Sequence, residues 1–157
     1  MSGSCGYDRA VAIKGMEHVG IVVDDLAAAV EFFVELGLKA EGESSGSVEG
    51  AWVDRIIGLE GVRADIAFVG TPDGESWLEL TQFHSPQSPD GDTHAPANAP
   101  GIRHISFSVD DIDAVAARLR ARGVEFVGDV VQYENAYRLC YFRGPAGVIV
   151  ELAEKLG

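Results

Sequence analysis

Two stretches of the chain show the same order of apolar and polar positions. Residues 18–38 and 104–124 each hold an alternating apolar segment, two aspartates, an apolar segment at helical spacing and a glycine. Alternation with period two predicts a half-buried strand, and apolar residues three and four apart predict an amphipathic helix. A glycine after the last apolar residue is typical of a helix C-terminus, because it accepts a positive φ. Each stretch therefore predicts a strand followed by a helix.

The two stretches are copies of one unit. His18 falls on His104 and Gly37 on Gly123, both 86 residues apart. Self-similarity at a fixed offset indicates a structural repeat. Three more strand-like stretches follow in each copy, near 48–56, 63–69 and 76–83 in the first and near 124–133, 137–143 and 147–153 in the second. Each unit therefore reads as βαβββ.

The boundaries of the first elements follow from local signals. We expect the leading strands at 13–23 and 103–109, where β-branched residues are frequent. Asp24 and Asp110 stand where a side-chain oxygen would cap a helix N-terminus. About fourteen extra residues near 43–65 distinguish the first copy from the second.

The chain divides into four segments on this pattern. Residues 84–101 hold four of the six prolines together with Ser, Asp, Asn and Gly, which is a linker composition. The expected fold class is α+β, with two βαβββ modules pairing into a cupped mixed sheet. The segments are a flexible N-terminal arm at 1–13, a first module at 14–83, a Pro-rich linker at 84–101 and a second module at 102–155.

Composition excludes several classes of protein. The chain has 157 residues and a formal net charge of −13, and this sign of charge argues against nucleic acid and anionic membrane surfaces as partners. No apolar run approaches the roughly 20 residues of a membrane span, and no secretory signal is visible. Two cysteines give no disulfide framework, so we expect a cytoplasmic protein. We also expect a small-molecule substrate.

Strand alternation places one His and one Glu of each module on the face away from its helix. These residues are His18 and Glu79 in the first module and His104 and Glu151 in the second. If the two sheets cup around a shared cleft, two imidazoles and two carboxylates converge. Such a set suits a divalent ion of Ni, Zn, Co, Mn or Fe and leaves coordination positions open for a substrate oxygen.

Further side chains on the inferred cleft faces are candidates for binding the substrate. Trp77, Thr81 and Phe83 alternate with buried positions on the same strand as Glu79. Tyr141 and Arg143 share one face of a strand in the second module and would suit an anionic substrate. Packing in the core is the alternative interpretation for Trp77 and Phe83.

At these residues the sequence resembles the vicinal oxygen chelate superfamily, which includes glyoxalase I, methylmalonyl-CoA epimerase, extradiol dioxygenases and bleomycin- or fosfomycin-resistance proteins. The resemblance covers about residues 14–155 and implies paired βαβββ modules with a metal in the cup. The implied ligands are His18, Glu79, His104 and Glu151. The resemblance rests on His18-Val-Gly-Ile-Val-Val-Asp-Asp-Leu, Leu78-Glu79-Leu80-Thr81, Gly101-Ile-Arg-His104 and Gly144-Pro-Ala-Gly-Val-Ile-Val-Glu151-Leu.

Individual members of the superfamily differ at these positions. Two His and two Glu resemble the bacterial type of glyoxalase I most closely. That enzyme usually has an Asn that helps to hold glutathione where this chain has Gln82-Phe83. Methylmalonyl-CoA epimerase usually has Gln in place of Glu79, extradiol dioxygenases use two His and one Glu, and metal-free resistance proteins generally lose the ligands.

The resemblance implies a divalent-metal-dependent, glyoxalase-like lyase or isomerase. It would transfer a proton next to a metal-bound carbonyl or hydroxyl, with Glu151 as the base and Glu79 as the second candidate. The alternatives are an acyl-CoA epimerase of the methylmalonyl-CoA type, a small-molecule-binding resistance protein and an Fe(II) dioxygenase. We expect a homodimer, with the cup formed either within one chain or across a swapped dimer.

Overall fold

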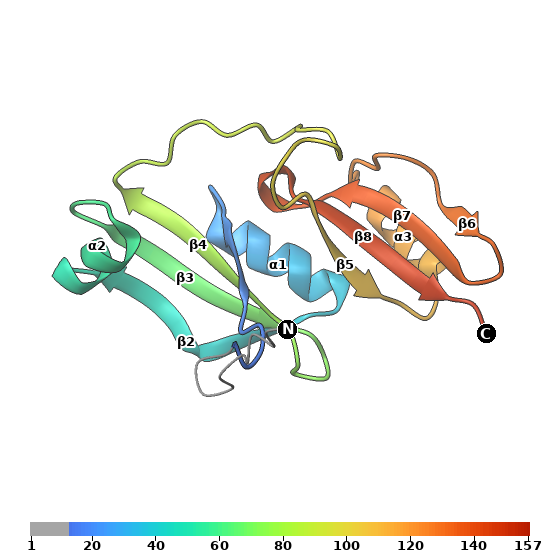
Figure 1. Ribbon diagram of the computed structural model, residues 1–157, viewed down its shortest axis with the longest axis horizontal. Helices are drawn as coiled ribbons and strands as arrows, with labels where there is room; N and C mark the ends of the chain where they lie inside the picture. The colour runs from blue at the N-terminus through green and yellow to red at the C-terminus, as the bar shows by residue number, and fades with distance from the viewer. Residues whose placement is uncertain (1–12) are drawn as a thin grey trace, which may run out of the picture.

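Two βαβββ modules make up the chain, joined by the Pro-rich linker (Figure 1). The computed structural model describes residues 13–157, apart from the side chain of Ser44, so nearly all of the expected N-terminal arm lies outside the described residues. The first module consists of β1 (Val19–Val22), α1 (Leu26–Leu36), β2 (Lys39–Glu49), α2 (Ala51–Ile57), β3 (Arg63–Gly70) and β4 (Trp77–Ser85). The second consists of β5 (His104–Ser108), α3 (Ile112–Ala121), β6 (Val131–Tyr133), β7 (Tyr137–Arg143), the short 3₁₀ turn η2 (Pro145–Gly147) and β8 (Ile149–Lys155).

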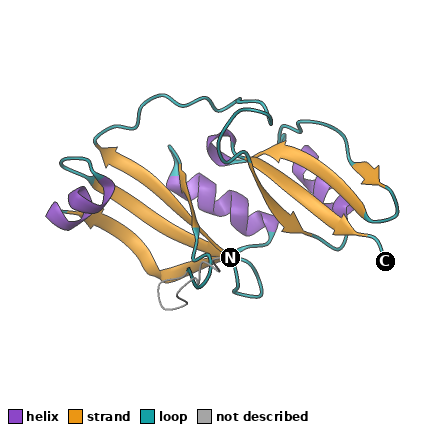
Figure 2. Ribbon diagram, in the orientation of Figure 1, coloured by secondary structure: helices purple, strands orange, loops and turns teal. Residues whose placement is uncertain are grey.

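The two sheets have the same topology, which confirms the predicted α+β fold. Their strand orders are β1-β4-β3-β2 and β5-β8-β7-β6, and Figure 2 shows the strands as two separate sheets. In each sheet the first strand lies parallel to the last, and the other neighbours are antiparallel. Gly20 lies opposite Glu79 in one sheet and Ser106 opposite Glu151 in the other. The sequence repeat is therefore a repeat of structure.

The helix N-caps lie one residue later than predicted. Asp25 and Asp111 cap α1 and α3, and each accepts a hydrogen bond of 2.9 Å from the backbone N–H three residues on. The prediction of Asp24 and Asp110 is wrong, because an N-cap oxygen must reach that N–H and only the second aspartate of each pair precedes the helix directly. Gly37 ends α1 as expected, with a φ of 124°.

A helix replaces the strand predicted at 48–56. This segment begins as the end of β2 and continues as α2, bounded by Gly50 and Gly58, which have φ values of 102° and 75°. Val53 of α2 is buried against Val62 and the end of the sheet. Its Trp, Val and Ile residues suit a strand, but tertiary packing overrides that propensity.

Two more boundaries differ from the prediction. The first strand is short and spans β1 alone rather than 13–23. Residues 124–133 form only an isolated bridge at Phe126 and the three-residue β6. Strand-like composition therefore overestimates the length of both segments, although single backbone hydrogen bonds still join Val23 to Thr81 and Val127 to Tyr141.

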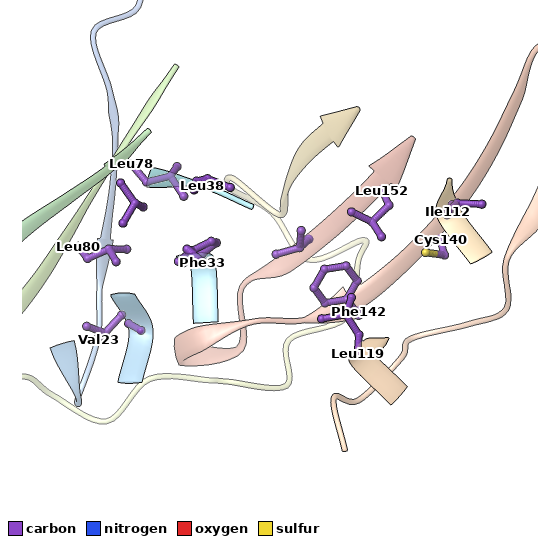
Figure 3. Close-up of a cluster of buried hydrophobic side chains, with 13 residues drawn as sticks. Val23, Phe33, Leu38, Leu78, Leu80, Ile112, Leu119, Cys140, Phe142 and Leu152 are labelled. Atoms are coloured by element: carbon purple, nitrogen blue, oxygen red, sulfur yellow. The ribbon is translucent and has the colours of Figure 1, made fainter. Parts of the chain in front are cut away.

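One hydrophobic core spans both modules. Phe33 and Leu80 of the first module belong to the same cluster as Phe142 and Leu152 of the second (Figure 3). The ring of Phe32 on α1 lies 6.3 Å from that of Phe142. Glu35 of α1 and Arg122, directly after α3, form an ion pair. The modules of one chain therefore meet through the sides that carry the helices.

The opposite side of each sheet, which we call its cup face, is open except at one end of the first sheet, where α2 packs Val53 near Ala64 and Phe83. Burial alternates along β1 and β5, with the more exposed positions on the side of His18 and His104. In the second module, Val131, Tyr133 and Tyr137 lie on the cup face by strand register and are 59%, 60% and 40% exposed. Apolar surface of this kind marks a binding site or an interface. No helix in the described part of the chain could cross a membrane.

Candidate metal centre

The first donor pair consists of His18, directly before β1, and Glu79 on the adjacent parallel strand β4. Their Nε2 and Oε2 atoms are 3.7 Å apart. The other oxygen of Glu79 accepts a hydrogen bond of 3.1 Å from the hydroxyl of Thr81, a buried polar residue two positions along β4. The Nδ1 of His18 contacts the carboxylate of the neighbouring Glu17. Both side chains of this pair are thus oriented by a polar neighbour.

The second donor pair occupies the equivalent place in the second module. The Nε2 of His104 lies 3.4 Å from the Oε2 of Glu151. The ring of Tyr141 lies 5.1 Å from that of His104, and Tyr141 is the cross-strand neighbour of Glu151. Burial, and then the Glu151 carboxylate, raise the pKa of Tyr141. Tyr141 therefore stays a neutral hydrogen-bond donor beside this pair at neutral pH.

An aromatic residue accompanies the first pair as well. Phe68 lies opposite Glu79 and meets the ring of His18 edge-on, with 5.6 Å between the centroids. Each module thus repeats a triplet of histidine, aromatic residue and glutamate. The repetition extends the pseudo-symmetry from the strands to the side chains of the site.

The donor pairs fit a divalent ion. Two donors on adjacent positions of an ion, each bound at about 2.0–2.2 Å, lie roughly 3 Å apart. The separations of 3.7 and 3.4 Å are near this value and longer than an ordinary hydrogen bond. Imidazole and carboxylate together suit Zn, Ni, Co, Fe and Mn. His18 and Glu79 would hold such an ion on one side, and His104 and Glu151 on the other.

The two pairs are not joined into one centre within a single chain. Among the residues that the structure describes, no three His, Cys, Asp or Glu side chains gather as a metal site. His18 and His104 nevertheless line one hollow of about 420 Å³, together with Trp77 and Ile102. The structure therefore presents two separate His–Glu pairs, one in each module.

The predicted substrate-binding residues occupy different surroundings. Trp77 lies against Gly70, where a Cβ atom would come within 2.6 Å of the indole ring. Thr81 holds Glu79, and Tyr141 lies beside His104, as described above. A contact with substrate stays a prediction for all of these residues.

Phe83 and Arg143 complete this predicted set. Phe83 packs against the small cluster around Val53 and lines a separate pocket. Arg143 donates from Nη1 to the carbonyls of Ala95 and Gly147, at 2.9 and 3.2 Å, and so ties the linker to the second module. Their contact with substrate also stays a prediction.

Glu17 and Phe68 are site neighbours that the sequence pattern did not reveal. Glu17 falls inside the strand predicted at 13–23, where alternation assigns it to the face opposite His18, whereas in the structure it precedes β1. Phe68 is placed only by the register between β3 and β4. A strand pattern fixes the face of a residue but not its cross-strand partner.

Comparison with known proteins assigns the family. A model described as the glyoxalase/bleomycin resistance protein/dioxygenase superfamily matches residues 15–152. The chain belongs to this superfamily. The vicinal oxygen chelate resemblance is thereby confirmed, and the superfamily contains enzymes as well as resistance proteins.

Several relatives within the superfamily are similar over nearly the whole chain. A glyoxalase family protein from Bacillus cereus, of known crystal structure, is 45% identical, with a TM-score of 0.89 over 95% of this chain and 99% of that one. YwbC of Bacillus subtilis (strain 168), an uncharacterized protein, is 31% identical over 90% of this chain and 98% of its own. A 2-epi-5-epi-valiolone epimerase from Actinomyces sp is 32% identical over 94% of this chain and 81% of its own.

Proposed function

We propose that this superfamily member is a divalent-metal-dependent lyase or isomerase of the glyoxalase type, which moves a proton next to a carbonyl or hydroxyl of a small substrate. The repeated His–Glu pair carries this proposal. In each module a partly exposed imidazole lies beside a carboxylate whose side chain is only 25% or 15% exposed, and repeating this arrangement gives no packing advantage. Four donors with open positions around an ion would suit a substrate that offers oxygen atoms.

The two glutamates would have different roles. A bound divalent ion would act as a Lewis acid, which makes a C–H bond beside a coordinated oxygen more acidic. Glu79 is held by the Thr81 hydroxyl and suits a permanent ligand. In the described part of the chain the Glu151 carboxylate has no hydrogen bond, only the 3.4 Å approach of His104. Glu151 is therefore the better base: it takes the substrate proton on a carboxylate oxygen and returns it to the neighbouring carbon or the opposite face.

We further propose that a second copy of the chain completes the centre. Each chain joins its modules through the helix sides and leaves open the parts of both cup faces that carry the donor pairs. In a symmetric dimer the first module of one chain faces the second module of its partner, so each of two identical sites receives all four donors. The exposed apolar residues of the cup faces would be covered in the same step.

An epimerase is the second candidate. The relative from Actinomyces sp that is 32% identical carries the name 2-epi-5-epi-valiolone epimerase. Epimerisation needs the same removal and return of a proton, on opposite faces of one carbon. An acyl-CoA epimerase of the methylmalonyl-CoA type would carry out the same proton transfer on the carbon next to a thioester carbonyl.

Solvent exchange tests the reaction class. The protein, loaded with Zn²⁺, Ni²⁺, Co²⁺ or Mn²⁺, is incubated in D₂O with methylglyoxal hemithioacetals, methylmalonyl-CoA or 2-epi-5-epi-valiolone, and deuterium incorporation is followed by NMR. We expect metal-dependent incorporation into one of these compounds. A protein that binds no divalent metal would instead fit a resistance protein, and oxygen consumption with bound iron would indicate a dioxygenase.

Complementation tests whether the site is shared. One variant carries His18→Ala with Glu79→Ala, and the other carries His104→Ala with Glu151→Ala. Mixed dimers of the two variants contain one intact site if the donors come from different chains, so a random mixture should bind about one quarter of the wild-type metal. A cup formed within one chain predicts no metal in the mixture, since every chain then lacks one donor pair.

A further inference from the structure

An apolar pocket of about 490 Å³ lies at the far end of the first module's cup face. Val22 at the end of β1 is 49% exposed and Leu59, after α2, is 43% exposed. Leaving aliphatic side chains open in a concave surface is unfavourable unless a ligand covers them. The apolar lining consists of Val22, Leu59, Phe83, Pro86, Pro89 and Ala146.

The pocket continues the face that carries the donors. Val22, at the end of β1, follows His18 by four residues. Phe83 follows Glu79 by four residues on β4. Each apolar residue therefore shares a face with the donor that precedes it. Four residues of a strand span about 13 Å. A substrate whose oxygen atoms lie at His18 and Glu79 would extend along the two parallel strands to reach the pocket.

Charge around the pocket selects the kind of group that enters it. Asp24 and Asp92 also line it, and its lining among the described residues includes no Lys, Arg or His. A phosphate or carboxylate group would meet two acidic side chains without a compensating cation. The pocket therefore disfavours the charged tails of coenzyme A and glutathione.

The first module and the linker supply most of the pocket, to which η2 of the second module adds Ala146. Ser108 stands where Val22 stands in the repeat, and Lys155 stands where Phe83 stands. Leu59 comes from the segment that includes α2, and the prolines come from the linker, neither of which has a counterpart in the second module as described. The first and second modules thus differ at the end of the cup face that holds the pocket. In a site shared by the two modules, this difference would fix the direction in which a substrate lies.

We propose that this pocket binds an uncharged apolar group, alkyl or aryl, of a substrate whose other end presents oxygen atoms to the donor pairs. The part of this proposal that places substrate oxygen atoms at the His–Glu pairs rests on the proposed function. The pocket itself is defined by its own lining and does not depend on a bound metal.

Alkyl hydroxamic acids of increasing chain length test the proposal. Their two vicinal oxygen atoms chelate divalent ions, and titration calorimetry on the metal-loaded protein measures Kd. Beyond the length that reaches the pocket, each added methylene should tighten binding by up to about threefold to fourfold. Replacing the terminal methyl by a carboxylate should remove that gain.

Two isosteric variants localise the effect. Val22→Thr should reduce the gain with chain length, whereas Val34→Thr, at a 42% exposed position on α1, should not. Acetohydroxamic acid, which is too short to reach, should bind equally to both variants and to the wild type. A Kd independent of chain length, or a gain retained by the terminal carboxylate, would overturn the proposal.

A second titration separates the pocket from the metal. Adding n-hexanol to metal-free protein should shift the methyl NMR signals of Val22 and Leu59 but not that of Val34. If acetohydroxamic acid does not bind at all, the proposed function fails while this titration still decides the pocket. Unshifted signals of Val22 and Leu59 would refute the pocket even if the metal site is real.

Discussion

At the scale of single residues, the site depends on pairs of donors that neighbouring side chains hold in place. Thr81 fixes one oxygen of Glu79, and Glu17 contacts the Nδ1 of His18. Partners of this kind orient a ligand and raise its basicity, so their loss weakens metal binding even though they touch no metal. Among the described residues, the Glu151 carboxylate has no hydrogen bond and only the 3.4 Å approach of His104, so it stands out against these restrained neighbours.

Glu151→Gln should reduce the exchange of the substrate proton by at least about 100-fold, because an amide cannot accept it. Much of the metal should remain, because the amide oxygen of Gln can still coordinate beside the three intact donors. Proton NMR measures the exchange and elemental analysis the metal. The control Glu125→Gln removes an exposed carboxylate near His94 and should leave both unchanged. Near-normal exchange in Glu151→Gln would assign the base elsewhere.

Glu17→Gln should weaken metal affinity by about tenfold or more, since the carboxylate partner of His18 Nδ1 is lost. Competition with a chelator of known affinity measures the change. Glu43→Gln, on β2, is a matched control on the same module and should retain the wild-type affinity. Equal affinities in all three proteins would show that Glu17 has no part in the site.

At the scale of elements, the repeated aspartate pairs begin both helices, and α1 in turn supplies Phe33 to the core. Asp25→Ala should lower the free energy of unfolding by about 1 kcal/mol, because the first turn of α1 loses its side-chain acceptor. Asp24→Ala removes the same charge one residue earlier and should change stability by less than about 0.5 kcal/mol. Urea denaturation measures both, and equal losses would contradict the assigned cap.

A pH-dependent contact joins α3 to β7. Arg138 donates to both oxygens of Asp113, at 2.7 and 2.8 Å, and these bonds hold the pKa of that carboxyl below its usual 3.8. The unfolded chain binds this proton more readily, so the contact stabilises the fold above about pH 3.8 and is lost as the pH falls through the lower, folded pKa.

Asp113→Asn should therefore lower the urea midpoint at pH 6, and the difference from wild type should shrink as the pH falls below about 3.8. The loss should also diminish in high salt, because the pair is exposed. A difference that does not vary with pH would mean that the ion pair is not its source.

Sequence pattern and structure agree where one face of an element is buried. Period-two alternation places His18, Glu79, His104 and Glu151 on the cup faces, because each strand has an apolar side against its helix. It fails at α2, where part of the strand predicted at 48–56 forms a helix held by the packing of Val53. Packing between distant segments decides such cases, and a local pattern carries no information about it.

At the scale of the whole molecule, the arrangement of the modules was not predictable. The face pattern is the same for a cup within one chain and for one shared by two chains, and only the core joining Phe33 to Phe142 distinguishes them. The net charge of −13 is compatible with either arrangement. It adds to the acidic surroundings of Asp24 and Asp92, which weaken the attraction of an anionic substrate.

Elemental analysis after exposure to divalent metals and removal of the excess tests the metal centre most directly. The chain has four histidines, which provide matched variants: His18→Ala and His104→Ala alter the proposed centre, whereas His84→Ala and His94→Ala do not. We predict about one ion per chain in the wild type and in the two control variants, and strongly reduced metal in both site variants. A wild-type protein without bound metal, or site variants that retain it as well as the controls do, would contradict the account.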